Sequence, residues 1–301
     1  MQELNRSTLG LSDNIYLSTP YSHEDPDIER ARFEMSNQVA WLLMQTGAAV
    51  FSPITHSHTL EEQVGEKEGH AFWMNQDLSY LQDWSNILVL ITAGGWRESS
   101  GVAKELEEAR ANNIPILTFD PLRQLDLVGL SGKKRSGKDT LGDVFAQHGY
   151  QKYALADPIK DAAQTIFNFS DAQLNGDRKE EEDPYWNRTP REVMQHFGTD
   201  AFRSEYGPDV WVDSLFQRLR FELPLRAVVT DVRFPNEVTG VQEVGGDVIR
   251  IDASERLSSS DGHASETALD GYEGYDRVVQ NNDSLDAFIR RGTRLVEQYY
   301  V

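Results

Sequence analysis

The chain of 301 residues contains no cysteine, which excludes disulfides, cysteine-ligated zinc sites and a cysteine nucleophile. It also lacks any run of about 18 apolar residues, so we expect no transmembrane helix and no membrane partner. Residues 1–13 lack the basic and apolar regions of a signal peptide. Together these absences predict a cytoplasmic protein.

Positive charge is scarce as well. The 29 Lys and Arg residues stand against 49 Asp and Glu residues, which gives a formal net charge of −20 at pH 7. An acidic protein repels the phosphates of a nucleic acid polymer, so we expect no such partner. A local pocket can still be positive, and small anionic ligands therefore stay compatible with this composition.

The length exceeds that of a typical single domain and favours two domains. In the first, residues 1–121, strand-like and helix-like segments alternate. The expected strands are 14–19, 48–52, 86–92 and 115–119, and the expected helices are 27–46, 69–82 and 100–112. Such alternation predicts a parallel sheet covered by helices.

A linker is expected at residues 122–125, and a second alternation fills residues 126–301. Its expected strands are 126–130, 153–156, 226–230 and 247–252, and its expected helices are 138–148, 191–204, 210–221 and 284–300. Two polar stretches, 175–187 and 254–274, are expected to be mobile surface segments. The second domain is thus also predicted to be an α/β domain with a parallel sheet.

A glycine-rich loop joins the first strand and helix of this second domain. It reads Gly132-Lys133-Lys-Arg-Ser136-Gly137-Lys138-Asp139-Thr140. Backbone N–H groups of such a loop surround phosphates, and Lys138 would reach the β- and γ-phosphates of ATP. The residue after this lysine is usually Ser or Thr, but here it is Asp139. Whether Asp139 or Thr140 meets Mg²⁺, directly or through water, is left open.

Charged residues elsewhere in this half suit a kinase whose acceptor is phosphorylated. Asp231 ends an apolar strand, where it could position Mg²⁺ or the acceptor oxygen, and Arg233 follows two residues later. Several cations could neutralise phosphate groups through bidentate contacts: Lys160, Arg191, Arg203, Arg233 and Arg250. Any one of them alone could equally be a solvated surface charge.

Five motifs of this half resemble those of bacteriophage deoxynucleoside monophosphate kinases, which are adenylate-kinase-like P-loop enzymes. They are 132–140, 156–160, 195–200, 231–237 and 263–266. The resemblance covers about 126–301 and implies transfer of the ATP γ-phosphoryl group to a deoxynucleoside monophosphate (dNMP) with Mg²⁺. If the chain is phage-encoded, the expected cytoplasm is that of the host.

The resemblance also implies residue roles. Lys138, Asp231 and Arg233 would serve catalysis. The dNMP would be bound by Asp157, Lys160, Arg191, Gln195, Asp200, Arg203, Arg233 and Glu237. Phosphomevalonate kinases share a similar Gly-Lys-Asp loop, but the acidic and aromatic context after Gln195 favours a dNMP.

Two carboxylates are the chemical candidates of the first domain. Asp77 lies on an expected helix, and Glu105 lies near the start of another, just past a strand. Two carboxylates can share the two roles in glycosidic cleavage, because one attacks the anomeric carbon while the other protonates the leaving base. Each acid taken alone would more simply be a surface residue.

Four pieces of this domain resemble the nucleoside 2-deoxyribosyltransferase-like superfamily, and within it the 2′-deoxynucleoside 5′-monophosphate N-glycosidases. They are the strand of Tyr16, Ser18 and Thr19, the Gln-Asp77-Leu helix, the 88–90 strand, and the motif from Ser99 through Gly101 to Glu105. The resemblance covers about 14–120 and implies that Glu105 is the nucleophile and Asp77 the proton donor. Transferases proper often carry Asp where this chain has Ser99, and a hydroxyl can donate to a 5′-phosphate that an Asp would repel.

Aromatic and histidine side chains could complete this site. His56, His58 and Trp96 are candidates for lining a base pocket, and the nucleotide-binding set becomes Tyr16, Ser18, Thr19, His56, Trp96, Ser99 and Gly101. With no third ligand evident, the His56-x-His58 pair is not expected to bind metal. Trp41 and Trp73 are expected in the core.

The sequence therefore predicts two three-layer α/β domains that both act on dNMPs. The first is a Rossmann- or flavodoxin-like deoxyribosyltransferase-like domain, and the second a P-loop kinase domain. Alternatives are an N-terminal deoxyribosyltransferase, an N-terminal module that binds nucleotides and regulates the kinase without chemistry, or an interaction protein with a vestigial P-loop. Base specificity, coupling between the sites and oligomeric state stay open, and a homo-oligomer is compatible with the sequence.

Overall fold

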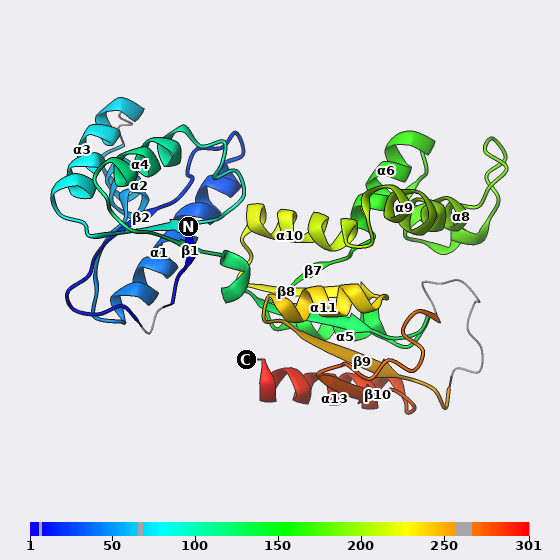
Figure 1. Ribbon diagram of the computed structural model, residues 1–301. Coiled ribbons are helices and arrows are strands. Elements are labelled where there is room, and N and C mark those ends of the chain that lie inside the picture. The colour runs from blue at the N-terminus through cyan, green and yellow to red at the C-terminus, as the bar shows by residue number, and fades with distance from the viewer. Residues whose placement is uncertain (6–7, 66–68, 257–266, 301) are drawn as a thin grey trace. The chain divides into compact units, whose positions relative to one another are not determined.

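The computed structural model describes residues 1–5, 8–65, 69–256 and 267–300, and within them the chain divides into two compact units (Figure 1). The N-terminal unit comprises Met1–Gln124 together with Gln217–Pro224. The C-terminal unit comprises Leu125–Phe216 and Leu225–Val301. Each unit is a parallel sheet covered by helices, so the predicted fold class is confirmed.

The N-terminal sheet has the strand order β1-β5-β4-β2-β3, and all of its pairings are parallel. Its strands are β1 (Gln2–Glu3), β2 (Asn14–Ser18), β3 (Ala49–Phe51), β4 (Ile87–Ile91) and β5 (Ile116–Phe119). Its helices are α1 (Pro26–Met44), α2 (Pro53–Val64), α3 (His70–Asp83) and α4 (Ser100–Ala111), and the 3-10 turn η2 (Pro121–Gln124) ends this stretch.

Side-chain alternation along the central strands builds two cores. Odd-numbered residues of β2 and β4, such as Leu17 and Val89, pack with α1 on one face. Even-numbered residues of the same strands, such as Tyr16 and Leu88, pack with α3 and α4 on the other. Both faces are covered, which explains why the apolar run of β4 is continuous.

The order of the strands reverses between β2 and β4, because β3 lies on one side of β2 whereas β4 and β5 lie on the other. In open α/β sheets, ligands bind in the crevice at the carboxyl ends of the strands flanking such a reversal. Ser18 ends β2 there, and the loop after β4 leads to Ser99, whose side chain caps the N-terminus of α4.

The C-terminal sheet has the strand order β10-β9-β6-β8-β7, again entirely parallel. Its strands are β6 (Asp126–Ser131), β7 (Gln151–Tyr153), β8 (Arg226–Val232), β9 (Asp247–Asp252) and β10 (Arg277–Gln280). Its helices are α5 (Lys138–Gln147), α6 (Asp157–Phe167), α7 (Asp171–Leu174), α8 (Pro190–Gln195), α9 (Phe202–Tyr206), α10 (Val210–Glu222), α11 (Pro235–Glu243) and α13 (Leu285–Tyr299), with the 3-10 turn η3 (Asp177–Glu180) and the π-helical η4 (His196–Ala201).

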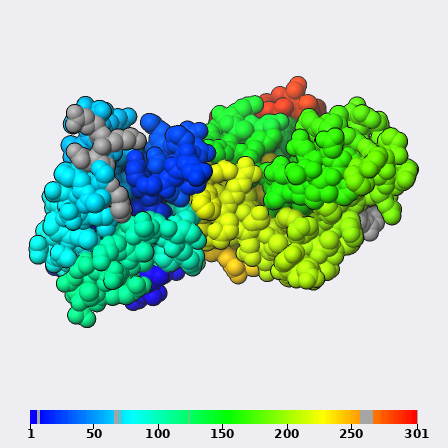
Figure 2. Space-filling view, turned by 90° about the horizontal axis from the view of Figure 1, so that it is seen from above, coloured from blue at the N-terminus to red at the C-terminus, as the bar shows by residue number. Residues whose placement is uncertain are grey.

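The central strand β6 carries the glycine-rich loop at its carboxyl end. Val128 and Leu130 point into the core formed with α5 and α13. Gly129 points to the other face, where α11 packs through Val241. The helices between β7 and β8 form much of the face of this unit seen in Figure 2, where they are green to yellow-green.

Several elements differ from the expectations. The helices α2, α6 and α11 and the strands β1 and β10 were not predicted, and the expected strand at 153–156 ends at Tyr153. Trp41 is 64% exposed, so its expected core position is wrong. The last turns of α10 belong to the N-terminal unit, although the sequence placed them in the kinase domain. The predicted motif at 263–266 lies outside the described residues.

No helix in the described ranges is long and apolar enough to cross a membrane.

Substitution of a central-strand residue should destabilise the C-terminal unit selectively. Leu130 is fully buried, so Leu130→Ala removes packed methyl groups and leaves a cavity that should cost ~2–5 kcal/mol of unfolding free energy. Hydrogen exchange of the β6 amides measures this loss of unfolding free energy in the C-terminal unit alone. The control is Val278→Ala in β10, where Val278 is 56% exposed and the expected change is within about 0.5 kcal/mol. Equal effects of the two variants would contradict this packing.

Candidate functional sites

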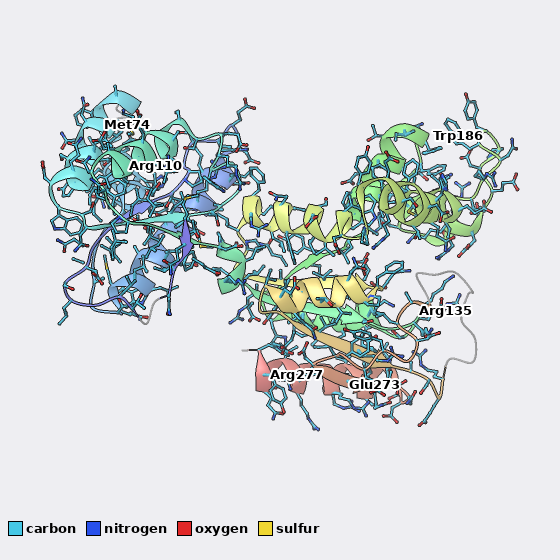
Figure 3. The ribbon with its side chains drawn as sticks, viewed as in Figure 1. Met74, Arg110, Arg135, Trp186, Glu273 and Arg277 are labelled. Carbon is cyan, nitrogen blue, oxygen red and sulfur yellow. The ribbon has the colours of Figure 1, made fainter. Side chains whose placement is uncertain are left out.

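The glycine-rich loop lies between β6 and α5, as a phosphate-binding loop requires. Gly137 caps α5 with a φ of +105°, a left-handed conformation that favours glycine. A Cβ at Gly137 would lie 2.6 Å from Asn281 Nδ2 and 2.9 Å from Phe288 Cε1. Asn281 Nδ2 in turn donates to the carbonyl of Ser136 at 2.7 Å, so the loop is held by the segment after β10. Arg135, labelled in Figure 3, lies in this loop.

Two side chains of the loop suit a bound nucleotide. Lys138 Nζ donates to the backbone carbonyls of Gly132 and Lys133, which keeps its ammonium at the loop. Ser136 Oγ is buried, and among the described residues it has no hydrogen-bond partner. An orphaned hydroxyl beside convergent backbone N–H groups fits a phosphate oxygen.

Asp139 and Thr140 lie in the first turn of α5, and Asp139 is exposed. Mg²⁺ in phosphoryl-transfer sites takes one or two protein oxygens and several phosphate or water oxygens. Both residues therefore fit the magnesium role predicted for them, and neither is distinguished from the other by its place. Arg250 and Arg233 line a small depression together with Gly132 and Lys133, so two of the predicted cations lie beside the loop.

A cavity of about 180 Å³ lies in the same unit and gathers most of the predicted acceptor residues. Its walls come from α6, α8, η4, α10 and the end of β8. The predicted residues that line it are Lys160, Arg191, Gln195, Arg203, Asp231, Arg233 and Glu237. Apolar contacts not expected from the sequence come from Leu155, Met194, Trp211 and Phe234.

Cations dominate one part of this cavity. Lys160, Lys179, Arg191 and Arg233 all line it, and the first, third and fourth lie close enough for their positive charges to act on Lys179. Burial and the nearby Lys160, Arg191 and Arg233 lower the pKa of Lys179. Mutual repulsion of this kind is relieved when an anion binds. Lys179 was not among the predicted residues because it lies in the acidic stretch 175–187.

Three predicted residues of the cavity have structural partners. Both carboxylate oxygens of Asp231 accept backbone N–H groups, from Leu155 at 2.7 Å and from Ala156 at 3.0 Å. Burial raises the pKa of Asp231. Arg203 pairs with Glu237, whose other oxygen accepts the N–H groups of Arg233 and Phe234. Burial raises the pKa of Glu237 to about 7.

Two predicted acceptor residues do not line the cavity. Asp157 accepts the N–H of Ala154 and lies 3.7 Å from Lys160 at the start of α6. Asp200 is exposed and lies beside His196 on η4. Their expected contact with a dNMP stays a prediction.

Glu105 is the central group of the N-terminal unit. It lies on α4, is 6% exposed, and accepts a hydrogen bond on each carboxylate oxygen. Tyr16 Oη donates to Oε1 at 2.7 Å, and Ser18 Oγ donates to Oε2 at 2.6 Å. Burial raises the pKa of Glu105 to about 7, although both hydrogen bonds favour the charged form.

Asp77 supplies the second carboxyl group from α3. It is 5% exposed, and its Oδ1 has no hydrogen-bond partner within the described part of the chain. Burial raises the pKa of Asp77 to about 7. The two carboxyls interact, since the charge of Asp77 also raises the pKa of Glu105. A neutral and an ionised carboxyl group can therefore coexist near pH 7.

Both carboxyls line a cavity of about 710 Å³, large enough for a nucleotide. Thr19, Ser99 and Gly101 line it too, as predicted for them, and Met74 of α3 (labelled in Figure 3) belongs to its wall. Ser99 Oγ accepts the N–H of Val102 at 3.3 Å, which leaves its own hydrogen available to donate. The dipole and N–H groups of α4 favour an anion at this end of the cavity.

Three predicted pocket residues lie elsewhere. His58 stacks on the ring of Phe33 and shares a hydrogen bond with Tyr21 Oη, and it does not line the cavity. His56 is exposed on α2 and contacts the rings of Phe51 and Trp73, not the cavity. Trp96 packs against the α4 side of the core and lines a different depression with Arg97. Trp73, which was expected in the core, lines the cavity and donates to Glu61 at 2.6 Å. Sequence spacing could not place His56, because it lies on α2, which was not predicted, or Trp96, because it lies in the loop between β4 and α4.

The strand, loop and helix order, the central position of β6 and the adjoining cationic cavity define a P-loop phosphotransferase. The chain belongs to the deoxynucleotide monophosphate kinase family, whose model matches residues 126–184 and 179–291. A relative from Acanthamoeba polyphaga mimivirus, named "Putative deoxynucleotide monophosphate kinase", is 33% identical over 183 residues, which is 54% of this chain and 91% of that protein. The predicted kinase class is therefore confirmed, and family membership implies ATP as the phosphoryl donor.

Solved structures similar to the chain include a dephospho-CoA kinase from Campylobacter jejuni and TT1252 from Thermus thermophilus. The first is 17% identical, covers 58% of this chain and 97% of its own, and has a TM-score of 0.33. The second is 14% identical, covers 59% of this chain and 99% of its own, and has a TM-score of 0.35. Residues 13–120 match a family described as "Domain of unknown function (DUF1937)". The phage origin and the glycosidase activity stay predictions.

The raised pKa of Glu105 predicts how stability depends on pH. Because the folded-state pKa is about 7 and the ordinary value is 4.5, stability is lost as pH rises from about 4.5 through 7. Glu105→Gln removes the ionisation, so it should stabilise the N-terminal unit at pH 8 by on the order of 3 kcal/mol. The gain should shrink steadily towards pH 5.

Hydrogen exchange of the β4 amides at several pH values measures this difference. The matched control is Glu107→Gln on the same helix, because the side chain of Glu107 is 70% exposed. A pH-independent effect of Glu105→Gln, or an equal gain from Glu107→Gln, would contradict the assignment.

Proposed function

We propose that the C-terminal unit transfers the γ-phosphoryl group of ATP to a dNMP. The observation that carries this is the group of four cations, Lys160, Lys179, Arg191 and Arg233, that lines one cavity in the unit that holds the P-loop. A dNMP brings two negative charges and accepts bidentate contacts from Arg. Trp211 and Phe234 offer aromatic surface for a base in the same cavity.

In this reaction a phosphate oxygen of the dNMP attacks the γ-phosphorus of ATP. The new O–P bond forms while the bond from Pγ to the β-phosphate oxygen breaks, so the products are a dNDP and ADP. Lys138 and the N–H groups of the loop hold the β- and γ-phosphates, and Arg233 at the end of β8 neutralises charge on the transferred group. Asp139 and Thr140 would hold Mg²⁺, which supplies further charge neutralisation when bound.

Asp231 acts in this proposal by position. Its two oxygens hold the N–H groups of Leu155 and Ala156, which fixes the turn before α6 and hence Lys160. It is thus better suited to shaping the acceptor cavity than to binding a metal ion directly.

We propose that the N-terminal unit hydrolyses the N-glycosidic bond of a dNMP, including dNMPs with modified bases. The observation that carries this is the pair of buried carboxyl groups of Glu105 and Asp77, both with a pKa of about 7, in one cavity at the sheet's reversal point. Environments that leave one acid ionised and one protonated provide a nucleophile and a proton donor together.

The proposed reaction has two balanced steps. An oxygen of ionised Glu105 forms a bond to C1′ of the deoxyribose, the C1′–N bond breaks, and the proton of Asp77 passes to the leaving base. Water then attacks C1′, gives a proton to Asp77, and releases Glu105 and deoxyribose 5-phosphate. Tyr16 and Ser18 each occupy one lone pair of Glu105, which orients the carboxylate and leaves a further lone pair for attack.

The 5′-phosphate is expected at the N-terminus of α4. The free hydroxyl hydrogen of Ser99 and the N–H of Gly101 would donate to it, and the helix dipole favours its charge. The cavity also contains the acidic Glu29, Glu61 and Glu98, which makes this local donor set necessary for any anionic substrate. Together the two activities would sort a nucleotide pool, since some monophosphates are destroyed while others proceed towards triphosphates.

Two crossed substitutions test whether the sites act independently. Glu105→Ala removes the nucleophile and should abolish release of free base while ATP-dependent dNDP formation continues. Lys138→Ala removes a charge at the transferred phosphate and should lower the kinase kcat by roughly 10²- to 10³-fold while base release continues. Chromatographic separation of base, dNMP and dNDP measures both activities in one sample.

Three results would redirect the proposal. Loss of both activities in either variant would argue against independent sites. Binding of a dNMP without base release, together with altered kinase kinetics, would favour a regulatory N-terminal module. Transfer of deoxyribose to an added free base would favour a transferase.

Lys179→Ala tests the cationic cluster. Loss of a charge-assisted contact to the acceptor should raise the KM for the dNMP by about 10- to 100-fold and leave the KM for ATP within about twofold. The control is Lys152→Ala, because Lys152 pairs with Asp143 on the surface at 2.7 Å. Equal increases in the two KM values, or an effect of Lys152→Ala as large as that of Lys179→Ala, would show that the cluster does not bind the acceptor.

A further inference from the structure

The end of α10 is built into the N-terminal unit, although its sequence neighbours on both sides belong to the C-terminal unit. The segment is Gln217–Pro224. Leu223 is 7% exposed and lies in the core that Leu17 and Ile91 form with α1. The segment therefore contributes to the folding of the N-terminal unit and does not merely pass over its surface.

Its contacts reach Asp120 just after β5 and the turn at Gly94 after β4. Arg220 forms two hydrogen bonds with Asp120, at 2.9 and 3.3 Å, and its backbone carbonyl accepts the N–H of Gly94 at 2.7 Å. The ring of Phe221 lies directly against Gly94, because a Cβ at this glycine would be 2.5 Å from Phe221 Cγ. Only glycine allows the ring to approach so closely.

The same turn is held from another direction by Arg32 of α1. Arg32 is 3% exposed, and its Nη2 donates to the carbonyl of Gly94 at 2.7 Å. Its Nη1 donates to the carbonyls of Tyr21 and Ser22, which lie in the loop after β2. The backbone of Gly94 thus accepts a hydrogen bond from α1 through its carbonyl and donates one to the end of α10 through its N–H. Its position depends on both contacts.

This turn leads into α4. The chain runs from Gly94 and Gly95 to Ser99, the cap of α4, and α4 carries Glu105. Phe221 itself lines the 710 Å³ cavity beside Arg32, Gly95 and Ser99. A segment distant in sequence therefore supplies an apolar wall of the cavity and supports the turn at its proposed phosphate end.

We propose that Phe221 is a substrate-positioning residue of the N-terminal site, and that this site is complete only with the segment 217–224. The inference rests on the proposed N-glycosidase function. Removal of the ring should loosen the turn before Ser99 and weaken binding of the 5′-phosphate end of a dNMP. The carboxyl pair of Glu105 and Asp77 should keep its protonation behaviour, because Phe221 carries no charge.

The test compares three variants of the full chain. Phe221→Ala should raise the KM for dNMP base release by about tenfold or more, with little change in kcat and none in the shape of the pH profile. Phe221→Leu, which restores apolar volume, should recover most of the affinity. Arg218→Ala is the matched control on the same turn, because its side chain is 45% exposed and pairs with Glu222.

Hydrogen exchange of residues 93–99 gives a second reading that needs no activity. The amides of this turn should exchange faster in Phe221→Ala than in the unaltered chain or in Arg218→Ala. An unchanged KM together with unchanged exchange would overturn the inference. A fall in kcat with a displaced pH profile would also overturn it, because the carboxyl pair would then be what Phe221 affects.

The two proposals fail in distinguishable ways. If the unaltered chain releases base from no dNMP, the glycosidase proposal is wrong. Exchange of the turn then decides the remaining claim: faster exchange in Phe221→Ala supports the segment as part of the cavity, and unchanged exchange refutes it.

Discussion

Every strand pairing in both sheets is parallel, and this places the start of each following helix at the carboxyl edge of the strands. Helix N-termini carry unpaired N–H groups and a positive dipole end, so this edge is where anions bind. In the C-terminal unit the edge holds Gly132 to Thr140 before α5. In the N-terminal unit it holds Ser99 before α4. Both candidate sites depend on the same geometric constraint.

The ionisable side chains that line the two cavities differ in the sign of their charge. The cavity of the C-terminal unit gathers cations, and burial together with their mutual repulsion lowers the pKa of Lys179. The cavity of the N-terminal unit gathers buried carboxyls, and their burial raises the pKa of Glu105 and Asp77 to about 7. The first arrangement suits the neutralisation of phosphates, whereas the second suits proton transfer and nucleophilic attack at neutral pH. Such a division agrees with the proposal that one chain carries two different reactions on one class of substrate.

The sequence was most informative where chemistry depends on local spacing. The P-loop, the Asp231 strand and the paired Glu105 and Asp77 could be found because each motif is a short stretch with a defined place on a strand or helix. Lys179 was not predicted because its neighbours in the sequence are acidic. Only the folded structure shows that it lies near Lys160 and Arg191. Phe221 was missed because its contact with Gly94 joins segments far apart in the sequence, which no periodicity reveals. Trp41 was misplaced for a related reason, since an aromatic residue at a helical position does not by itself say which face is covered.

The central claim is that the two sites carry out different reactions, phosphorylation and base release, on the same class of substrate. An analysis of the products tests it most directly. The full chain would be incubated with ATP, Mg²⁺ and a panel of normal and modified dNMPs, and free base, dNMP and dNDP would be separated chromatographically over time. The account predicts that dNDP forms from some dNMPs and that free base with deoxyribose 5-phosphate forms from at least one. Formation of dNDP without free base from any member of the panel would contradict it.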